Sequence, residues 1–371
     1  RRVAKLLYLV TEDWYFVSHR LPLAVAARAA GYEVVVVTRV REMGSIIAAH
    51  GIRVIPFEMS RRGMNPLREL PTLFQLWRLY RRERPDIVHH VALKPVLLGG
   101  LAARLAGVRA VVSAVAGLGF LFSGQDRAPL AAKLFKRLLP GLIARGRAII
   151  QNPEDAAMLA DCGVDVPRIQ MIRGAGVDTA IYSPTPEPPG TPLVVLPARL
   201  LRDKGVGEFV AAARWLREQG VAARFALVGA PDPANPACVT DAELQSWIAE
   251  GAIEYWGHRA DMPAVFASCH VVCLPSYREG LPKVLLEAAA SGRPIVTADA
   301  PGCREVVRDG DNGLLVPARD AKALARALRR LLDDARLRRA MGVRGREIAV
   351  VEFSVERVIN ETLALYRELE R

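Results

Sequence analysis

Two cations in the second half of the chain have the types and spacing of a phosphate site. Arg199 and Lys204 lie five residues apart in one loop, together with Gly205, so both can reach the same point. Fixed cations of this kind suit a diphosphate, which departs as a charged group during a transfer reaction. The alternative is a pair of solvated loop residues without a ligand.

Two carboxylates follow in SYREGLPKVLLEAAASGRPIVTAD, residues 276–299, which is typical of a loop, a helix and a buried strand. Pro282 fits the first helical position, where a missing N–H costs nothing. The helix N-terminus can bind an anion such as phosphate, with Glu279 beside it and Glu287 about two turns further along. Carboxylates that accept from hydroxyls next to a phosphate indicate a nucleotide-sugar site. Alternatively, they are a surface glutamate and a capping glutamate on an ordinary helix.

The elements that must position these residues follow an alternating pattern. Short apolar runs alternate with helical periodicity along the whole chain, which predicts an α/β protein with doubly wound parallel sheets. The proline-rich stretch TPEPPGTP, residues 185–192, is typical of a linker. We therefore expect two similar Rossmann-like domains, residues 1–184 and 193–353, whose loops meet at one cleft.

The loops of the first domain carry candidate acceptor-side residues. Strand ends in a parallel sheet meet at one edge, which brings together His19, Arg20, His90 and Lys94. His89 and His90 are adjacent on a strand, so at most one of them faces a ligand. No GxGxxG follows the first strand, which argues against a nicotinamide or flavin cofactor.

The net charge of +12 is unevenly distributed. Residues 1–190 contain 26 Lys and Arg against 15 Asp and Glu, so this half should meet an acidic partner or an anionic membrane. Phe120 and Phe122 lie in a glycine-flanked loop, and the following apolar helical stripe carries Lys133, Lys136 and Arg137. A basic amphipathic helix favours a membrane surface. The alternative is an ordinary helix that covers the sheet.

Composition restricts the class of protein. The chain has 371 residues, 51% of them hydrophobic, yet no apolar run approaches the ~20 residues of a membrane helix. We see no secretory leader, and five cysteines without framework spacing fit a reducing cytoplasm. We expect a cytoplasmic protein, peripheral on the inner face of the membrane. Cys269, His270 and Cys273 lie in a buried-strand pattern, so we interpret them as core residues and expect no metal site.

Three segments resemble the family 4 retaining glycosyltransferases of GT-B fold: RLLRDKG at 199–205, EGLPKVLLEA at 279–288 and PGCREVVRDGDNGLLV at 301–316. In the first half, YFVSHRLPLA at 15–24 and HHVALKP at 89–95 resemble the bacterial subgroup that builds lipid-linked or surface glycans. Two features depart from the family pattern. TEDWYFVSH fills the place of a common Gly-Gly turn, and residues 114–119 contain no histidine.

The resemblance implies a role for each residue. Arg199 and Lys204 would hold the donor diphosphate, Glu279 would lie near the donor sugar, and Glu287 would hold the ribose hydroxyls. Backbone N–H groups of Gly280 and Leu281, just before Pro282, would bind the phosphates. His19 and His90 are alternatives for the contact that the missing histidine makes. A C-terminal helix, residues 354–371, would pack back on the first domain.

We therefore expect a metal-independent retaining glycosyltransferase without a cofactor. Its donor is a nucleotide-sugar, UDP-linked rather than GDP-linked, and its acceptor is a polyprenyl-diphosphate-linked or other glycan. The alternatives are a nucleotide-sugar epimerase or another GT-B enzyme and, from a different class, a non-enzymatic basic protein that binds anions or nucleic acid. No nucleic-acid motif is present, so we expect no nucleic-acid partner.

Overall fold

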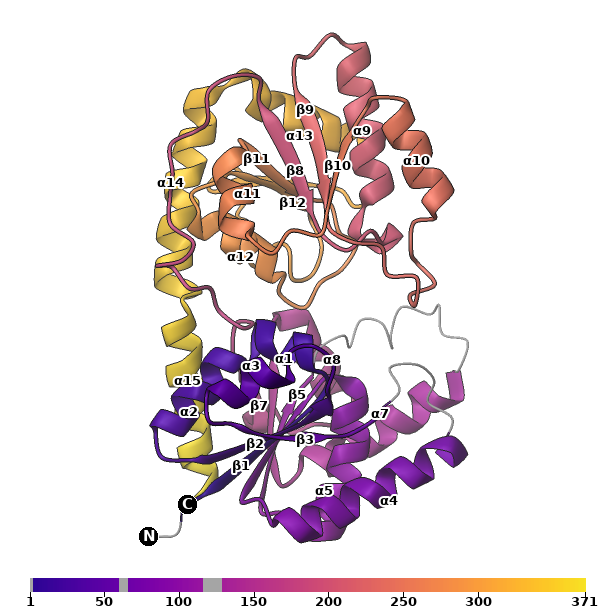
Figure 1. Ribbon diagram of the computed structural model, residues 1–371, viewed down its shortest axis with the longest axis vertical. Helices are drawn as coiled ribbons and strands as arrows, with labels where there is room; N and C mark the ends of the chain where they lie inside the picture. The colour runs from indigo at the N-terminus through magenta and orange to yellow at the C-terminus, as the bar shows by residue number, and fades with distance from the viewer. Residues whose placement is uncertain (1–2, 60–65, 116–128) are drawn as a thin grey trace. The chain divides into compact units, whose positions relative to one another are not determined.

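The computed structural model describes residues 3–59, 66–115 and 129–371. The chain divides into unit 1, Arg1–Ala175 with Arg357–Arg371, and unit 2, Gly176–Glu356. Each unit contains one parallel β-sheet with helices on both faces (Figure 1). The predicted α/β fold class is confirmed. The boundaries at 184, 192 and 353 stay a prediction.

Unit 1 has a seven-stranded sheet in the order β3-β2-β1-β4-β5-β6-β7. Its apolar strands are buried on both faces, as parallel sheets require. Leu6 and Tyr8 of β1 enter one core, whereas Leu7 and Leu9 enter the core on the opposite face. The strands are β1 (Lys5–Glu12), β2 (Glu33–Arg39), β3 (Arg53–Pro56), β4 (Ile87–Val91), β5 (Ala110–Ala114), β6 (Gly146–Ile150) and β7 (Ile169–Met171).

The helices of unit 1 cover these two cores. The helical segments are α1 (Asp13–His19), α2 (Leu21–Ala29), α3 (Gly44–Ala49), α4 (Pro66–Glu83), η1 (Pro95–Gly99), α5 (Gly100–Ala106), α7 (Pro129–Ile143), α8 (Pro153–Asp161) and η2 (Val166–Arg168). Helix α1 was predicted as a loop. Its formation depends on tertiary contacts: Phe16 packs on Tyr8, and the buried Asp13 accepts backbone N–H groups from Arg41 and Met43.

The last helix, α15 (Val355–Leu369), completes the core of unit 1. Leu363 and Tyr366 are buried beside Tyr8 of the first strand. The Tyr366 hydroxyl lies 3.0 Å from the Tyr8 hydroxyl and 2.6 Å from Nδ1 of His89. The two ends of the chain are therefore joined by a buried polar cluster within one unit.

Unit 2 has a six-stranded sheet in the order β10-β9-β8-β11-β12-β13. Its strands are β8 (Leu193–Pro197), β9 (Arg224–Val228), β10 (Glu254–Gly257), β11 (Val271–Leu274), β12 (Ile295–Ala298) and β13 (Gly313–Val316). Its helical segments are η3 (Arg202–Lys204), α9 (Val206–Glu218), α10 (Asp241–Ala249), α11 (Met262–Ser268), α12 (Lys283–Ala290), α13 (Ala321–Asp333) and α14 (Ala335–Glu352).

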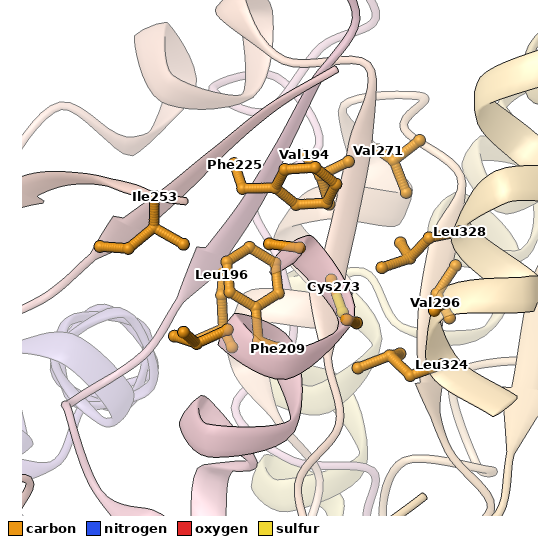
Figure 2. Close-up of a cluster of buried hydrophobic side chains, with 14 of the residues drawn as sticks. Val194, Leu196, Phe209, Phe225, Ile253, Val271, Cys273, Val296, Leu324 and Leu328 are labelled. Atoms are coloured by element: carbon orange, nitrogen blue, oxygen red, sulfur yellow. The ribbon is translucent and has the colours of Figure 1, made fainter. Parts of the chain in front are cut away.

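One core of unit 2 lies between the sheet and helices α9 and α13. Figure 2 shows Phe209 of α9 and Leu324 and Leu328 of α13 against side chains of the sheet. Cys273 belongs to this cluster, and Cys269 belongs to the core on the other face. Both thiols are fully buried, which confirms their interpretation as core residues.

Each sheet reverses its direction of growth at one place. In unit 1 this switch point lies between β1 and β4, and in unit 2 it lies between β8 and β11. Loops at the carboxyl ends of the strands diverge there, which is where open α/β sheets bind ligands. Arg199 and Lys204 follow β8, and Glu279 follows β11, so the three residues lie at the switch point of unit 2.

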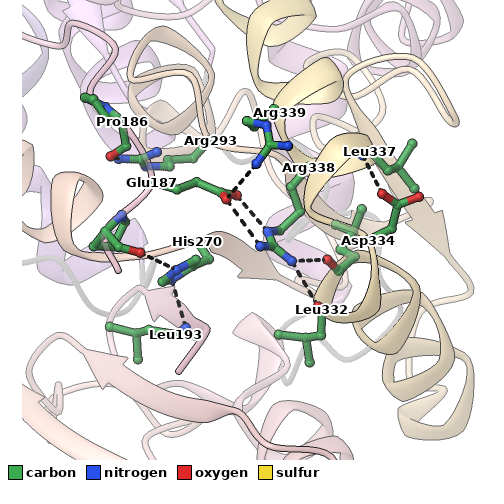
Figure 3. A network of polar contacts seen from close by, with 12 residues as sticks. Pro186, Glu187, Leu193, His270, Arg293, Leu332, Asp334, Leu337, Arg338 and Arg339 are labelled. Atoms are coloured by element: carbon green, nitrogen blue, oxygen red, sulfur yellow. Dashed lines mark hydrogen bonds and ion pairs between the residues drawn. The ribbon is translucent and has the colours of Figure 1, made fainter. Parts of the chain in front are cut away.

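Residues 179–193 of unit 2, here called the strap, are bonded to side chains from distant parts of the same unit. Figure 3 shows Arg338, His270 and Arg293 directed at this segment. Arg338 Nε donates to Glu187 Oε1 at 2.7 Å, and Arg293 Nη2 donates to Thr185 Oγ1 at 2.6 Å. The proline-rich stretch is therefore bonded to other segments of unit 2, to which it belongs.

Candidate functional site

The loop after β8 lies against the loop after β11 because Gly205 has no side chain. Gly205 adopts a left-handed φ of +72°, and an added Cβ would lie 2.3 Å from the carbonyl oxygen of Pro275. No other residue fits so close to a backbone carbonyl. This approach brings Lys204, immediately before the glycine, next to Glu279.

Lys204 and Glu279 form an ion pair at the switch point of unit 2. Nζ of Lys204 lies 2.5 Å from Oε1 of Glu279, and the side chains are only 17% and 13% exposed. Partial burial of both groups strengthens the attraction relative to a surface pair. The Lys204 ammonium and the Glu279 carboxylate, which can accept from a hydroxyl group, are therefore held at one point although 75 residues separate them in sequence.

The Glu279 loop rests on a second glycine. The Glu279 N–H donates to the carbonyl oxygen of Pro301 at 2.9 Å. Gly302 has a φ of +82°, and an added Cβ would lie 2.5 Å from the Glu279 carbonyl oxygen and 2.7 Å from that of Gly280. The turn at residues 301–302 thus fixes the backbone that carries Glu279.

Arg199 has a different partner from Lys204. Its Nη1 lies 2.7 Å from Oδ2 of Asp232, in the loop after β9, and its side chain is 43% exposed. The structure therefore brings Lys204 and Glu279 together, whereas Arg199 pairs with a carboxylate that the sequence did not indicate. The predicted role of Arg199 on a diphosphate stays a prediction.

Helix α12 positions Glu287. Pro282 was predicted at the first helical position but is the N-cap, one residue before the first helical residue, Lys283. The buried Leu281 precedes it. Glu287 is 6% exposed, and this burial raises the pKa of its carboxyl group. Lys283, one turn earlier and 3.2 Å away, lowers the pKa again. The predicted phosphate contacts of the Gly280 and Leu281 backbone stay a prediction.

In unit 1, His19 and Arg20 lie where α1 ends and α2 begins. The His19 ring stacks on Tyr15 with centroids 4.1 Å apart. Arg20 is 3% exposed, and its buried Nε has no hydrogen-bond partner in the described structure. A buried donor without a partner is costly, which makes the Nε of Arg20 an unusual atom of this unit.

His89 and His90 point to opposite faces of the sheet, and both are fully buried. His90 Nε2 lies 3.0 Å from the Tyr80 hydroxyl, and burial lowers its pKa to about 3. Lys94 is also largely buried, with Nζ 2.6 Å from Oε1 of Glu69. The structure thus encloses His90 and Lys94 within unit 1, and their predicted acceptor contacts stay a prediction.

The predicted membrane-contact residues are only partly described. Lys133 and Arg137 are exposed on α7, and Lys136 is half-buried. Phe120 and Phe122 lie outside the described residues. No helix in the described ranges is both long enough and apolar enough to cross a bilayer.

The same ranges contain no group of three His, Cys, Asp or Glu side chains that could hold a metal ion. The absence of a cofactor stays a prediction.

Comparison with known proteins identifies the family. Residues 191–334 match the family model of glycosyl transferases group 1, and residues 5–152 match that of glycosyl transferase 4-like proteins. The N,N'-diacetylbacillosaminyl-diphospho-undecaprenol α-1,3-N-acetylgalactosaminyltransferase of Campylobacter jejuni is 30% identical over 86% of this chain and 87% of its own length. The chain belongs to the family 4 glycosyltransferases.

Two further proteins resemble this glycosyltransferase over most of its length. The UDP-Gal:α-D-GlcNAc-diphosphoundecaprenol α-1,3-galactosyltransferase of Escherichia coli is 26% identical over 83% of this chain and 82% of its own length. The crystal structure of Anabaena Alr3699/HepE in complex with UDP and glucose superposes with a TM-score of 0.80 at 20% identity, covering 98% of this chain and 99% of the other. This likeness establishes the GT-B fold, which was predicted from the sequence.

Sequence reasoning missed two residues of this glycosyltransferase. Asp232 pairs with Arg199, and Gly302 lies against the backbone of Glu279. Asp232 lies far from Arg199 in sequence, so no local pattern reveals it. Gly302 follows Pro301 in a segment that was recognised as similar to the family, and a Pro-Gly pair is a turn signal that could have found it.

Proposed function

We propose that this glycosyltransferase moves a sugar from a UDP-sugar to a polyprenyl-diphosphate-linked acceptor, with retention of anomeric configuration. The observation that carries the proposal is the Lys204–Glu279 pair at the switch point of unit 2. The names of the Campylobacter and Escherichia coli relatives support it, since both describe diphospho-undecaprenol acceptors and one describes a UDP-sugar.

The proposed chemistry assigns one task to each group. Lys204 and Arg199 neutralise the diphosphate, Glu279 contacts the donor sugar, and Glu287 accepts from the ribose hydroxyls. The bond between the anomeric carbon and the diphosphate oxygen breaks, and the acceptor oxygen bonds to the same face of that carbon. The leaving phosphate takes the acceptor proton. Fixed cations neutralise the charge of the leaving group without a divalent metal. Turnover should therefore be unchanged in EDTA.

Lys204→Ala tests the cation directly. Removal of one preorganised charge at the leaving group should lower kcat about 100-fold or more. Released UDP is measured with a panel of UDP- and GDP-sugars and a lipid-diphosphate acceptor. Arg202→Ala is the matched control, because Arg202 lies in the same turn but pairs with Glu243 and is 53% exposed. A near-normal rate in Lys204→Ala would refute the assignment.

We also propose that unit 1 contacts an anionic membrane. Lys133 and Arg137 are exposed on α7, while Leu70 and Phe74 of α4 are 56% and 54% exposed. The Arg78 guanidinium lies over the Phe74 ring, 5.8 Å from its centroid. Exposed apolar side chains together with exposed cations are suited to the interface between lipid headgroups and acyl chains.

Charge reversal on α7 tests the membrane contact. Lys133→Glu with Arg137→Glu should weaken binding to phosphatidylglycerol vesicles about tenfold or more, because each basic residue near such a surface contributes about 1 kcal/mol. Sedimentation with vesicles measures this. Lys322→Glu with Arg326→Glu is the control, since these exposed α13 residues have the same spacing and charge change. Equal loss in both variants, or equal binding to neutral vesicles, would contradict the proposal.

A further inference from the structure

Arg20 differs from the other buried arginines in the described part of the chain. Arg20, Arg293 and Arg338 are 3%, 2% and 5% exposed. Arg293 donates to the carbonyl oxygen of Phe266 at 2.7 Å, and Arg338 donates to Glu187 at 2.7 Å (Figure 3). In contrast, Arg20 Nε is buried without a hydrogen-bond partner, and its guanidinium forms no ion pair with any of the described residues.

The carboxylates closest to Arg20 in sequence are bonded to other groups. Oε1 of Glu12 lies 3.1 Å from Nη1 of Arg39, and Oδ2 of Asp13 accepts from two backbone N–H groups of the loop after β2. A guanidinium is always charged in a protein, and a buried charge without a partner is costly. Such a cost is expected of a residue whose partner is a ligand, because functional groups are often kept at the expense of stability.

Arg20 lies where an open α/β sheet binds ligands. It separates α1 from α2, which follow directly on β1, beside the switch point between β1 and β4. Phe16 of α1 and Leu23 of α2 belong to the core that contains Tyr8, so both helices lie on this face of the sheet. His89 stacks on Tyr8 with ring centroids 5.1 Å apart, and its buried Nε2 also lacks a hydrogen-bond partner in the described structure. Two buried nitrogen atoms without partners thus occur on one face of the switch-point strands.

A phosphate group has the charge and the geometry that Arg20 requires. The guanidinium is planar and presents parallel N–H donors, which match two oxygens of a phosphate. The donor diphosphate has its proposed cations, Lys204 and Arg199, in unit 2. We propose that Arg20 binds the other diphosphate of the reaction, that of the lipid-linked acceptor, within unit 1. The inference rests on the acceptor class proposed above.

Arg20→Met tests whether the arginine has a structural role, because it removes the charge and keeps an unbranched side chain. Since the charge has no partner in the described structure, its removal should leave the urea midpoint of unfolding unchanged or raise it. Arg338→Met is the control. Its guanidinium is similarly buried but bonds to Glu187 and to the carbonyl oxygens of Leu331 and Leu332, so its loss should lower the midpoint. A comparable fall in Arg20→Met would make Arg20 a structural residue and overturn the proposal.

Calorimetry with two probes that differ in the diphosphate tests the ligand. One probe is N-acetylglucosaminyl diphosphofarnesol, and the other is farnesyl N-acetylglucosaminide, which has no phosphate. The wild type should bind the diphosphate probe about tenfold or more tightly, as expected for hydrogen bonds with a charged group. Arg20→Met should lose most of this preference. Its affinity for UDP should equal that of the wild type, because the donor diphosphate is assigned to unit 2.

The outcomes separate this inference from the proposed function. If the wild type prefers the diphosphate probe and Arg20→Met keeps the same preference, the role of Arg20 is overturned while the proposed acceptor stands. If the UDP affinity falls in Arg20→Met, the residue acts on the donor and the inference is overturned. If the wild type binds both probes equally, or neither, the proposed acceptor class fails and the inference fails with it.

Discussion

The two cations predicted to bind a diphosphate each have a carboxylate partner. Lys204 pairs with Glu279, and Arg199 pairs with Asp232. A diphosphate that binds both cations must therefore replace or join these carboxylates. The more buried Lys204–Glu279 pair is the harder one for a diphosphate to separate, because a cation and a carboxylate shielded from water attract each other more strongly than an exposed pair.

The Tyr366 hydroxyl gives a residue-level prediction for stability. Tyr366→Phe removes the partner of both the Tyr8 hydroxyl and His89 Nδ1, and both groups are fully buried. Each buried group left without a partner costs about 1–3 kcal/mol, so the free energy of unfolding of unit 1 should fall by about 2–6 kcal/mol. Urea denaturation measures the change. Tyr255→Phe, half-buried in unit 2, should change stability by less than about 0.5 kcal/mol, and equal losses in both variants would contradict this account.

At the scale of elements, the alternation of strands and helices was predictable because buried parallel strands form continuous apolar runs. The predicted strand Leu193–Ala198 and the predicted helix Gly207–Gln219 correspond to β8 and α9. Helix α1 was not predictable, because WYFVSH has no clean helical periodicity and the helix depends on Asp13 and Phe16 contacts from other elements.

The contacts of the site were predictable only in part. The sequence indicated that Lys204 and Glu279 share a ligand, and the structure shows that the loops after β8 and β11 bring them together. The pairing of Arg199 with Asp232 could not be foreseen, since it depends on the register between β8 and β9. The bonds that fasten residues 185–188 also come from residues more than 80 positions away.

The turn at residues 301–302 gives a prediction at the scale of a loop. Gly302→Ala would place a Cβ 2.5 Å from the Glu279 carbonyl oxygen, so it should displace the loop and lower kcat/KM at least about tenfold. Gly310→Ala is the matched control. Gly310 has a similar φ of +78°, but nothing lies within 4 Å of an added Cβ. If both variants lose the same activity, backbone strain alone explains the effect and the loop contact does not matter.

At the scale of the whole molecule, three buried histidines predict how stability depends on pH. Burial lowers the pKa of His89 and His90 in unit 1 and of His270 in unit 2. The backbone N–H of Leu193 donates to His270 Nδ1, so this imidazole is neutral and carries its proton on Nε2, which donates to Pro188. Protonation would break the bond with Leu193.

Stability should therefore fall as pH decreases below about 6.5, where histidines of the unfolded chain take up protons and the folded ones do not. Each buried histidine contributes up to about 1.4 kcal/mol per pH unit in this range. Urea unfolding at pH 7.5, 6.5 and 5.5 measures the loss, which should be larger for unit 1. In unit 2, Glu287 has a raised pKa and acts in the opposite direction. A constant unfolding free energy from pH 7.5 to 5.5 would contradict the prediction.

The position of α15 in the core of unit 1 has a consequence for how the chain matures on the ribosome. Unit 2 is one continuous stretch, whereas unit 1 needs residues from both ends of the chain. Domains usually fold in the order in which they are synthesised. Here the first unit to begin is completed after unit 2, because Tyr8 contacts Tyr366, which is synthesised after all of unit 2. During that interval the apolar groove that α15 fills is open to chaperones.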